Sequence, residues 1–344
     1  MRRSLFILFT ILFSLPAAHA QAPASAAPPV NTEQQQAVEE MQRGKSADAI
    51  AALEKMAAAN PNQKGVQHDL GLAYYRAGKL ISARQAFERA IAADSHDLES
   101  VQLQGLTLYR LGQPAAAIPY LERVKTWSPN VNADASHVLG LCYLNSGKID
   151  AARSAFATEY ALPAESGAAY LILARMLSTA NLPDQGAEAA QKALTITPGL
   201  PLAHLLIGEV ALYKSNILEA ITQFEAERKL NPSYAPIYER LADAYIKVGK
   251  YDQAQEALMQ SLALDTSSTG PFLLMGKVLL RRNDPENASM YLKHAEKMDP
   301  SNFITHTLLG QAYRSLGKEA DAKAEFDAAS KIHAGSELKL QSVQ

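Results

Sequence analysis

Three sets of residues have types that could do chemistry: a Gly-Lys-Ser tripeptide, the histidines and a lone cysteine. Gly44-Lys45-Ser46 matches the end of a phosphate-binding loop, but that loop also requires glycine five residues before Gly44, where the chain has Glu39. The Gly-Lys pair also recurs at Gly78-Lys79, Gly147-Lys148, Gly249-Lys250 and Gly317-Lys318. We therefore interpret the pair as part of a repeated turn and not as a nucleotide site.

The histidines are spaced too widely to form a zinc site on one helix, because none lies three or four residues from another. Those beyond the first twenty residues are His68, His96, His137, His204, His294, His306 and His333. The sequence also lacks the motifs H-E-x-x-H, G-x-S-x-G and G-x-G-x-x-G. Catalytic residues could still come together from distant segments of the chain, but no motif supports such a site. We therefore expect that the protein is not an enzyme and holds no cofactor or metal.

Cys142 is the single cysteine, so the chain cannot form an internal disulfide. Several residues that lie one or more 34-residue intervals away from Cys142, such as Ala244 and Val210, are alanine or valine. Their type favours a small buried side chain at Cys142 over a reactive thiol. Of the 344 residues, 48% are hydrophobic and 20% are charged, which is enough apolar material for a folded core. The formal net charge is −2, whereas nucleic-acid binding usually needs a strongly basic surface. We expect no nucleic-acid partner.

The N-terminus has the pattern of a secretory signal peptide. Arg2 and Arg3 precede the apolar run 5–15, and Ala18 and Ala20 form a small-x-small cleavage site. The run is too short for a membrane span, which needs ~20 residues. We expect a signal peptide at 1–20, a Pro/Ala-rich linker at 21–29 and no membrane span after cleavage. The chain is then exported, to the periplasm of a Gram-negative bacterium or otherwise secreted, by the general secretory route in preference to the twin-arginine route.

The rest of the chain repeats itself every 34 residues, with one step of 35. Nine windows begin at residues 30, 64, 98, 133, 167, 201, 235, 269 and 303. Position 8 is always small: Ala37, Gly71, Gly105, Gly140, Ala174, Gly208, Ala242, Gly276 and Gly310. Position 20 is also small: Ala49, Ala83, Ala117, Ala152, Gly186, Ala220, Ala254, Ala288 and Ala322. Small residues at a fixed interval indicate helices that cross closely.

Other positions support the same register. Position 24 is bulky in most windows, as at Phe87, Phe156 and Phe224, and glycine recurs in the turn between the two helices. This pattern resembles the tetratricopeptide repeat family, although the usual tryptophan of the first helix is replaced and the fifth repeat is degenerate. The resemblance implies an all-α fold, an α-solenoid (superhelix) of about nine antiparallel helix pairs over residues 30–336, with a tail at 337–344. We also expect a softer joint at 160–167, beside the degenerate repeat.

In this family the first helix of each repeat lines a concave face. Positions 4, 8 and 11 pack, so positions 5, 9 and 12 lie one residue round the helix and face a groove. The candidate groove residues are His68, Leu72, Tyr75, Gln102, Leu106, Tyr109, His137, Leu141, Arg175, Glu209, Glu239, Asp243 and Lys277. Those before residue 150 are mostly apolar or aromatic, and those after it are charged. The alternative is that neighbouring helices cover the leucines and that water alone solvates the charges.

The resemblance implies a non-enzymatic scaffold that binds a protein or peptide segment in this groove. Exported members of the family suggest roles in assembling envelope, secretion, pilus or polysaccharide-export machinery. A second hypothesis is a carbohydrate- or peptidoglycan-binding accessory protein that uses the tyrosines and the charged half of the groove. Binding of glycans, or of a protein from an envelope extract, distinguishes these two hypotheses.

Overall fold

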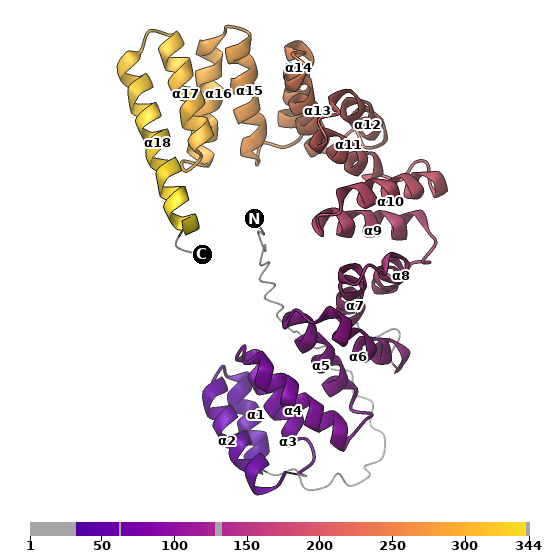
Figure 1. Cartoon of the computed structure of the whole chain (residues 1–344). Coiled ribbons are helices and arrows are strands. Elements are labelled where there is room, and N and C mark those ends of the chain that lie inside the picture. The colour runs from indigo at the N-terminus through magenta and orange to yellow at the C-terminus, as the bar shows by residue number, and fades with distance from the viewer. Residues whose placement is uncertain (1–31, 62, 128–132, 342–344) are drawn as a thin grey trace. The chain divides into compact units, whose positions relative to one another are not determined.

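The computed structural model describes residues 32–61, 63–127 and 133–341, and these ranges contain eighteen α-helices and no strand (Figure 1). The expected signal peptide and linker lie outside the described residues. The chain alternates first and second helices of each repeat, which confirms the all-α helix-pair fold. In the part described, no helix combines the length and apolar character that a membrane crossing requires.

The first helices are α1 (Thr32–Gln42), α3 (Val66–Arg76), α5 (Leu98–Arg110), α7 (Ala133–Asn145), α9 (Gly167–Thr179), α11 (Ala203–Tyr213), α13 (Ala235–Lys247), α15 (Thr269–Arg281) and α17 (Phe303–Ser315). The second helices are α2 (Ser46–Ala59), α4 (Leu80–Ala93), α6 (Pro114–Trp127), α8 (Ile149–Glu159), α10 (Pro183–Ile196), α12 (Ile217–Leu230), α14 (Tyr251–Leu264), α16 (Pro285–Met298) and α18 (Glu319–Gln341). Residues 337–341, expected as a tail, therefore continue the last helix.

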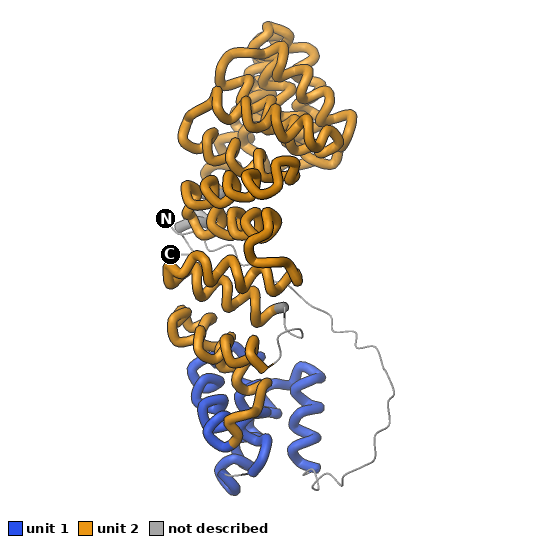
Figure 2. The backbone as a smooth tube through the Cα atoms, turned by 90° about the vertical axis from the view of Figure 1, so that its right-hand side faces the viewer, with its two compact units in different colours: residues 1–93 blue, residues 94–344 orange. Residues whose placement is uncertain are grey.

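Backbone contacts divide the chain into two compact units, residues 1–93 and 94–344, coloured blue and orange in Figure 2. The described part of the first unit holds α1 to α4, and that of the second holds α5 to α18. The softer joint at 160–167 lies within the second unit and stays a prediction.

The small residue at position 8 lies against the bulky residue at position 24 of the same repeat. A Cβ atom added to Gly208 would lie 2.4 Å from the Cε1 atom of Phe224, a ring that is completely buried. All four phenylalanines at position 24 face a glycine in this way: Phe87 with Gly71, Phe156 with Gly140, Phe224 with Gly208 and Phe326 with Gly310. Close helix crossing thus comes from a missing side chain opposite a ring, as the small positions predict.

Nine residues spaced like the repeats adopt a left-handed backbone in the turn between first and second helix. Six are the predicted glycines: Gly44, Gly78, Gly112, Gly147, Gly249 and Gly317. The other three are Asn181, Ser215 and Asn283, with φ of 62°, 62° and 61°. Asparagine tolerates this conformation better than serine, whose Cβ clashes with its own backbone there. The turn is thus kept even where its preferred residue is missing.

A tyrosine at position 11 joins consecutive repeats within each unit. The Tyr245 hydroxyl donates a 2.7 Å hydrogen bond to Glu225 on the preceding α12, and the Lys250 ammonium lies 6.0 Å from the centre of the Tyr245 ring. Burial, followed by the bond to Glu225, raises the pKa of Tyr245 to about 12, so the hydroxyl stays a donor. The same arrangement recurs as Tyr74, Glu54 and Lys79, and as Tyr143, Glu122 and Lys148. In these three repeats the lysine of the Gly-Lys pair thus lies over an aromatic ring.

Arg153 of α8 connects the second helix of repeat 4 to the first helix of repeat 5. Arg153 is only 6% exposed, and its Nη1 atom donates a 2.8 Å hydrogen bond to the hydroxyl oxygen of Tyr170 on α9. The guanidinium also forms ion pairs with Asp150 and with Glu165 of the connecting segment. Arg153 therefore fastens α9 to α8 across residues 160–166, where the sequence alone predicts a softer joint.

Candidate functional site

The candidate groove residues lie on the first helices and are accessible to solvent. Twelve of the thirteen are half-buried and Arg175 is exposed, so none is lost in the core. In the first unit, α3 carries His68, Leu72 and Tyr75. In the second unit, α5 carries Gln102, Leu106 and Tyr109, α7 carries His137 and Leu141, α9 carries Arg175, α11 carries Glu209, α13 carries Glu239 and Asp243, and α15 carries Lys277.

In the first unit, the surface beside α3 includes a small hollow against the first helix of repeat 1. Gln34, Val38 and Asp69 help to line it, and the Gln34 side-chain amide donates a 2.6 Å hydrogen bond to Asp69. The His68 ring meets the buried Phe87 ring edge-on, with centres 6.5 Å apart. His68 therefore packs on the residue at position 24 and is half-buried.

The apolar part of the candidate groove in the second unit is formed by Leu106, Tyr109 and Leu141. These side chains come from the first helices of two successive repeats and are half-buried. Burial, with a smaller contribution from Cys142 on the next first helix, raises the pKa of Tyr109, so its hydroxyl is neutral. Half-buried leucines beside a neutral tyrosine offer apolar surface and one hydrogen-bonding group, a combination enriched at protein interfaces.

Three residues at groove positions of the repeats already pair or pack within the chain. The His137 Nδ1 atom lies 2.9 Å from a carboxylate oxygen of Glu159 on α8, so this nitrogen already has a partner. Met41 and Leu144 occupy position 12, like Tyr75 and Tyr109, but are 3% and 5% exposed. Position 12 thus provides a contact surface in only some of the repeats.

The charged part of the second unit contains ion pairs between and within first helices. Arg240 of α13 donates a 3.0 Å hydrogen bond to Glu209 of α11, and Lys247 lies 3.8 Å from Asp243. Arg240 was not a candidate because it lies at position 6, and its charge opposite Glu209, 31 residues away, is the signal that could have identified it. These exposed pairs contribute little stability, since water screens them.

Glu239 differs from the other charged candidates because it is partly covered by the next first helix. Its carboxylate lies against Gly270, where an added Cβ would come within 2.2 Å of the Oε1 atom. Burial raises the pKa of Glu239, with Asp243 acting in the same direction and Arg240 against it. A cationic group beside a carboxylate in this environment stabilises its charged form and so lowers its pKa.

Chemical groups outside this face include a thiol and one cluster of metal-binding side chain types. Cys142 is fully buried, and burial raises its pKa to about 12, which makes it a poor nucleophile at neutral pH. Glu296, His306 and Glu325 lie close enough together to share a metal ion. They belong to α16, α17 and α18, so the search for histidines spaced along one helix could not find them.

Curated relatives and solved structures are similar to the chain at low identity. The BBSome complex member BBS4 of Bos taurus is 22% identical over 283 residues, which cover 82% of this chain and 54% of that protein. The TPR repeat-containing protein YpiA of Bacillus subtilis (strain 168) is 30% identical over 104 residues, or 30% of this chain and 24% of that one. The chain thus spans about half or less of these relatives.

Among solved structures, that of the APC/C hetero-tetramer Cut9–Hcn1 matches with a TM-score of 0.45 and 21% identity, covering 78% of this chain and 52% of that one. Family models of the tetratricopeptide repeat match residues 35–97, 137–201 and 273–337, and a further one matches 235–268. A model of the anaphase-promoting complex, cyclosome, subunit 3 matches residues 82–156. The repeat models cover more than half of the chain. The chain belongs to the tetratricopeptide repeat family.

Proposed function

We propose that this protein is an exported, non-enzymatic scaffold that holds a protein or peptide segment against the first helices of its second unit. The observation that carries the proposal is that Leu106, Tyr109 and Leu141, on the first helices of two successive repeats, are only half-buried. The family as a whole binds protein partners, and its repeats present such a face. The partner is expected to place apolar side chains against Leu106, Tyr109 and Leu141.

The charged part gives the partner an orientation. Arg175 is exposed and Glu239 is half-buried, while Glu209 pairs with Arg240. Charges of both signs along one face favour a segment with complementary charges and penalise one that lies in the wrong direction. An extended or helical segment with an apolar end and a charged end fits this distribution.

Export to the periplasm of a Gram-negative bacterium rests on the sequence of residues 1–20 alone. An exported scaffold of this kind would serve an envelope, secretion, pilus or polysaccharide-export assembly. The absence of an enzymatic role is likewise part of the proposal, supported by the missing catalytic motifs and by the buried thiol.

Site-specific photo-cross-linking in native envelope extracts tests the proposal. A photoreactive phenylalanine analogue is placed at Leu106, Tyr109 or Leu141, one position at a time. Matched controls carry it at Leu218 and Met259, which are 68% and 57% exposed on second helices. We expect a discrete protein adduct at the first-helix positions and none at the two controls.

Two results would contradict the proposal. Equal cross-linking at Leu218 and Met259 would indicate non-specific contact with exposed apolar side chains. Saturable glycan binding that is lost with Tyr109→Ala, in the absence of any protein adduct, would support the carbohydrate-binding hypothesis instead. Export is tested separately by fractionating cells and sequencing the N-terminus of the protein.

A further inference from the structure

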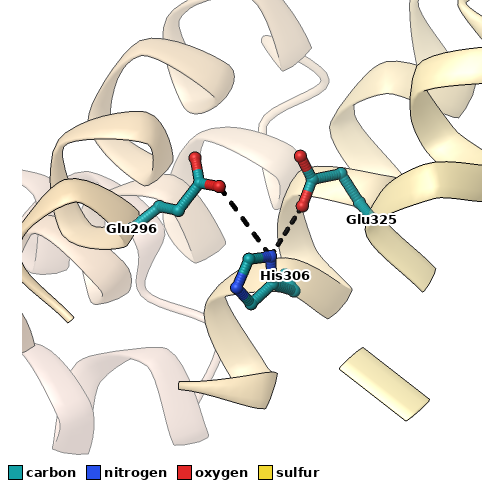
Figure 3. Close-up of side chains that lie close together, drawn as sticks. All are labelled: Glu296, His306 and Glu325. Atoms are coloured by element: carbon teal, nitrogen blue, oxygen red, sulfur yellow. Dashed lines mark hydrogen bonds and ion pairs between the residues drawn. The ribbon is translucent and has the colours of Figure 1, made fainter. Parts of the chain in front are cut away.

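A buried histidine lies between two carboxylates at the end of the second unit. The His306 residue is 6% exposed and its Nδ1 atom is 2.7 Å from Glu325 Oε2 and 4.0 Å from Glu296 Oε1. Figure 3 shows the ring between the two acidic side chains. The three residues come from three consecutive helices, α16, α17 and α18. The cluster lies at positions 4, 23 and 28 of its repeats and so is distinct from the groove positions.

The other ring nitrogen fixes the orientation and tautomer of His306. Its Nε2 atom lies 3.0 Å from the Pro300 carbonyl oxygen, which can only accept, so Nε2 carries the hydrogen. Repeat 7 has Tyr238 in the same position, and its hydroxyl donates to the Pro232 carbonyl at 2.7 Å. A donor to this proline is therefore a recurring structural requirement. In His306 it leaves the Nδ1 lone pair facing the carboxylates.

A lone pair that faces carboxylate oxygens requires a cation between them. Burial lowers the pKa of His306, but hydrogen bonds to Glu325 and Pro300 outweigh it and raise the pKa, so a proton can serve in a metal-free chain. A proton, however, bonds to Glu325 and leaves Glu296 4.0 Å away. Two carboxylates and a neutral imidazole carry a charge of about −2, which one divalent ion would balance.

The spacing of the three ligand atoms suits a small tetrahedral ion. Bonds of about 2.0–2.2 Å to nitrogen and oxygen place two ligands of a tetrahedral ion about 3.3–3.6 Å apart. The separations from Nδ1, 2.7 Å and 4.0 Å, lie on either side of this range, so modest side-chain rotation closes the site. The Glu296 side chain is 35% exposed, which gives access to solvent and leaves room for a water as fourth ligand.

We propose that Glu296, His306 and Glu325 bind one Zn²⁺ ion, which joins α16, α17 and α18. Imidazole nitrogen with carboxylate oxygens is a ligand set that suits zinc and does not suit Mg²⁺ or Ca²⁺, which take oxygen ligands. Metal-binding histidines commonly donate their second N–H to a backbone carbonyl, as His306 does to Pro300. The ion fastens the last repeat to its neighbour, at the end of an array where each repeat otherwise depends on nearest-neighbour contacts.

Repeat 6 provides a comparison within the same chain. His204 occupies position 4 there, and its Nδ1 atom lies 2.6 Å from Gln223 Oε1 at position 23. Position 28 of the preceding repeat is Leu194, so neither carboxylate is present. An amide oxygen and a leucine give no charge to hold a cation, so His204 is the matched control for His306.

Isothermal titration of the chelator-treated full chain with Zn²⁺ tests the proposal. We expect one saturable site per chain that Mg²⁺ does not occupy, and we expect Zn²⁺ to raise the midpoint of thermal unfolding. Mutating a residue that only orients a metal ligand lowers the metal affinity about 10–100-fold. Because Glu296 and Glu325 are themselves ligands in the proposed site, Glu296→Gln and Glu325→Gln should each weaken zinc binding at least about tenfold. His306→Tyr should abolish it while keeping the donor to Pro300, as in repeat 7. His204→Gln should leave the affinity unchanged.

X-ray absorption of the zinc-loaded protein gives an independent readout without any variant. We expect one imidazole nitrogen and carboxylate oxygens at about 2.0–2.2 Å. The proposal is overturned if the unaltered chain lacks a saturable zinc site, if His306→Tyr binds as tightly as the unaltered chain, or if His204→Gln removes the site. A zinc-bound species with only oxygen ligands would also overturn it.

Discussion

The first helices of the repeats carry two neighbouring stripes that behave differently. At position 8 the residue is small in all nine repeats, and in six of them it is a glycine whose neighbour at position 24 leaves no room for a Cβ. At position 9, one residue further, Leu141 and Glu209 remain half-buried and differ from repeat to repeat. The partner of the first stripe is another part of the same chain. The proposed function assigns the second stripe a partner from outside the chain.

The largest expected effect breaks the packed stripe. Gly208→Ala should lower the free energy of unfolding by about 1–3 kcal/mol, because the new Cβ meets the buried Phe224 ring and overpacks the helix crossing. Urea denaturation followed by circular dichroism measures it. Gly199→Ala is the control, since nothing lies within 4 Å of a Cβ there. Its effect should stay below about 0.5 kcal/mol.

A double variant sharpens this prediction. Repeat 7 combines Ala242 at position 8 with Leu258 at position 24, both fully buried, so an alanine and a leucine can pack together at these two positions. Gly208→Ala combined with Phe224→Leu should therefore be more stable than the sum of the two single changes, by about 0.5–3 kcal/mol. Strict additivity would show that the two positions do not contact each other as the structure describes.

The second stripe should respond in the opposite way, through binding and with little change in folding. Tyr109→Ala should weaken partner binding by about 2 kcal/mol, or about thirtyfold, because aromatic anchors carry much of the energy of an interface. Affinity for the cross-linked partner measures it, with Leu218→Gln as the control on a second helix. A loss of the same size with Leu218→Gln would place the partner on the wrong face.

The smallest effect concerns the turn that presents both stripes. Ser215 has a φ of 62°, where six equivalent turns have glycine. Ser215→Gly should raise the free energy of unfolding by about 0.5–1 kcal/mol, since glycine removes the steric cost of the left-handed conformation. Asn283→Gly should gain less, because asparagine tolerates this conformation. Both are compared in parallel urea titrations, and destabilisation by Ser215→Gly would contradict the described turn.

The packing could be predicted because the chain repeats its own constraints. Gly208 and Phe224 form one of several equivalent pairs, so a single sequence supplies many examples of one geometry. Glycines alone predict the left-handed turns, so the turn at Ser215 could not be predicted, because serine does not favour that conformation. A repeat pattern predicts the backbone conformation of a position best where most repeats have the same residue type at that position.

The clusters of polar residues could not be predicted in this way. Arg153 binds Glu165 and Tyr170 in a single junction, and His306 meets its two carboxylates from separate helices. Each depends on a combination of side chains that does not recur in the other repeats, so an average over repeats hides it. Comparing residues one repeat apart, as for Glu209 and Arg240, is the kind of search that finds such pairs.

Hydrogen exchange of the free chain and of the chain bound to its cross-linked partner tests the central claim most directly. The account predicts slower exchange in Leu98–Arg110 and Ala133–Asn145, the first helices that carry Leu106, Tyr109 and Leu141, and unchanged exchange in the second helix Ile217–Leu230. Slower exchange in Ile217–Leu230, with none in the two first helices, would contradict it.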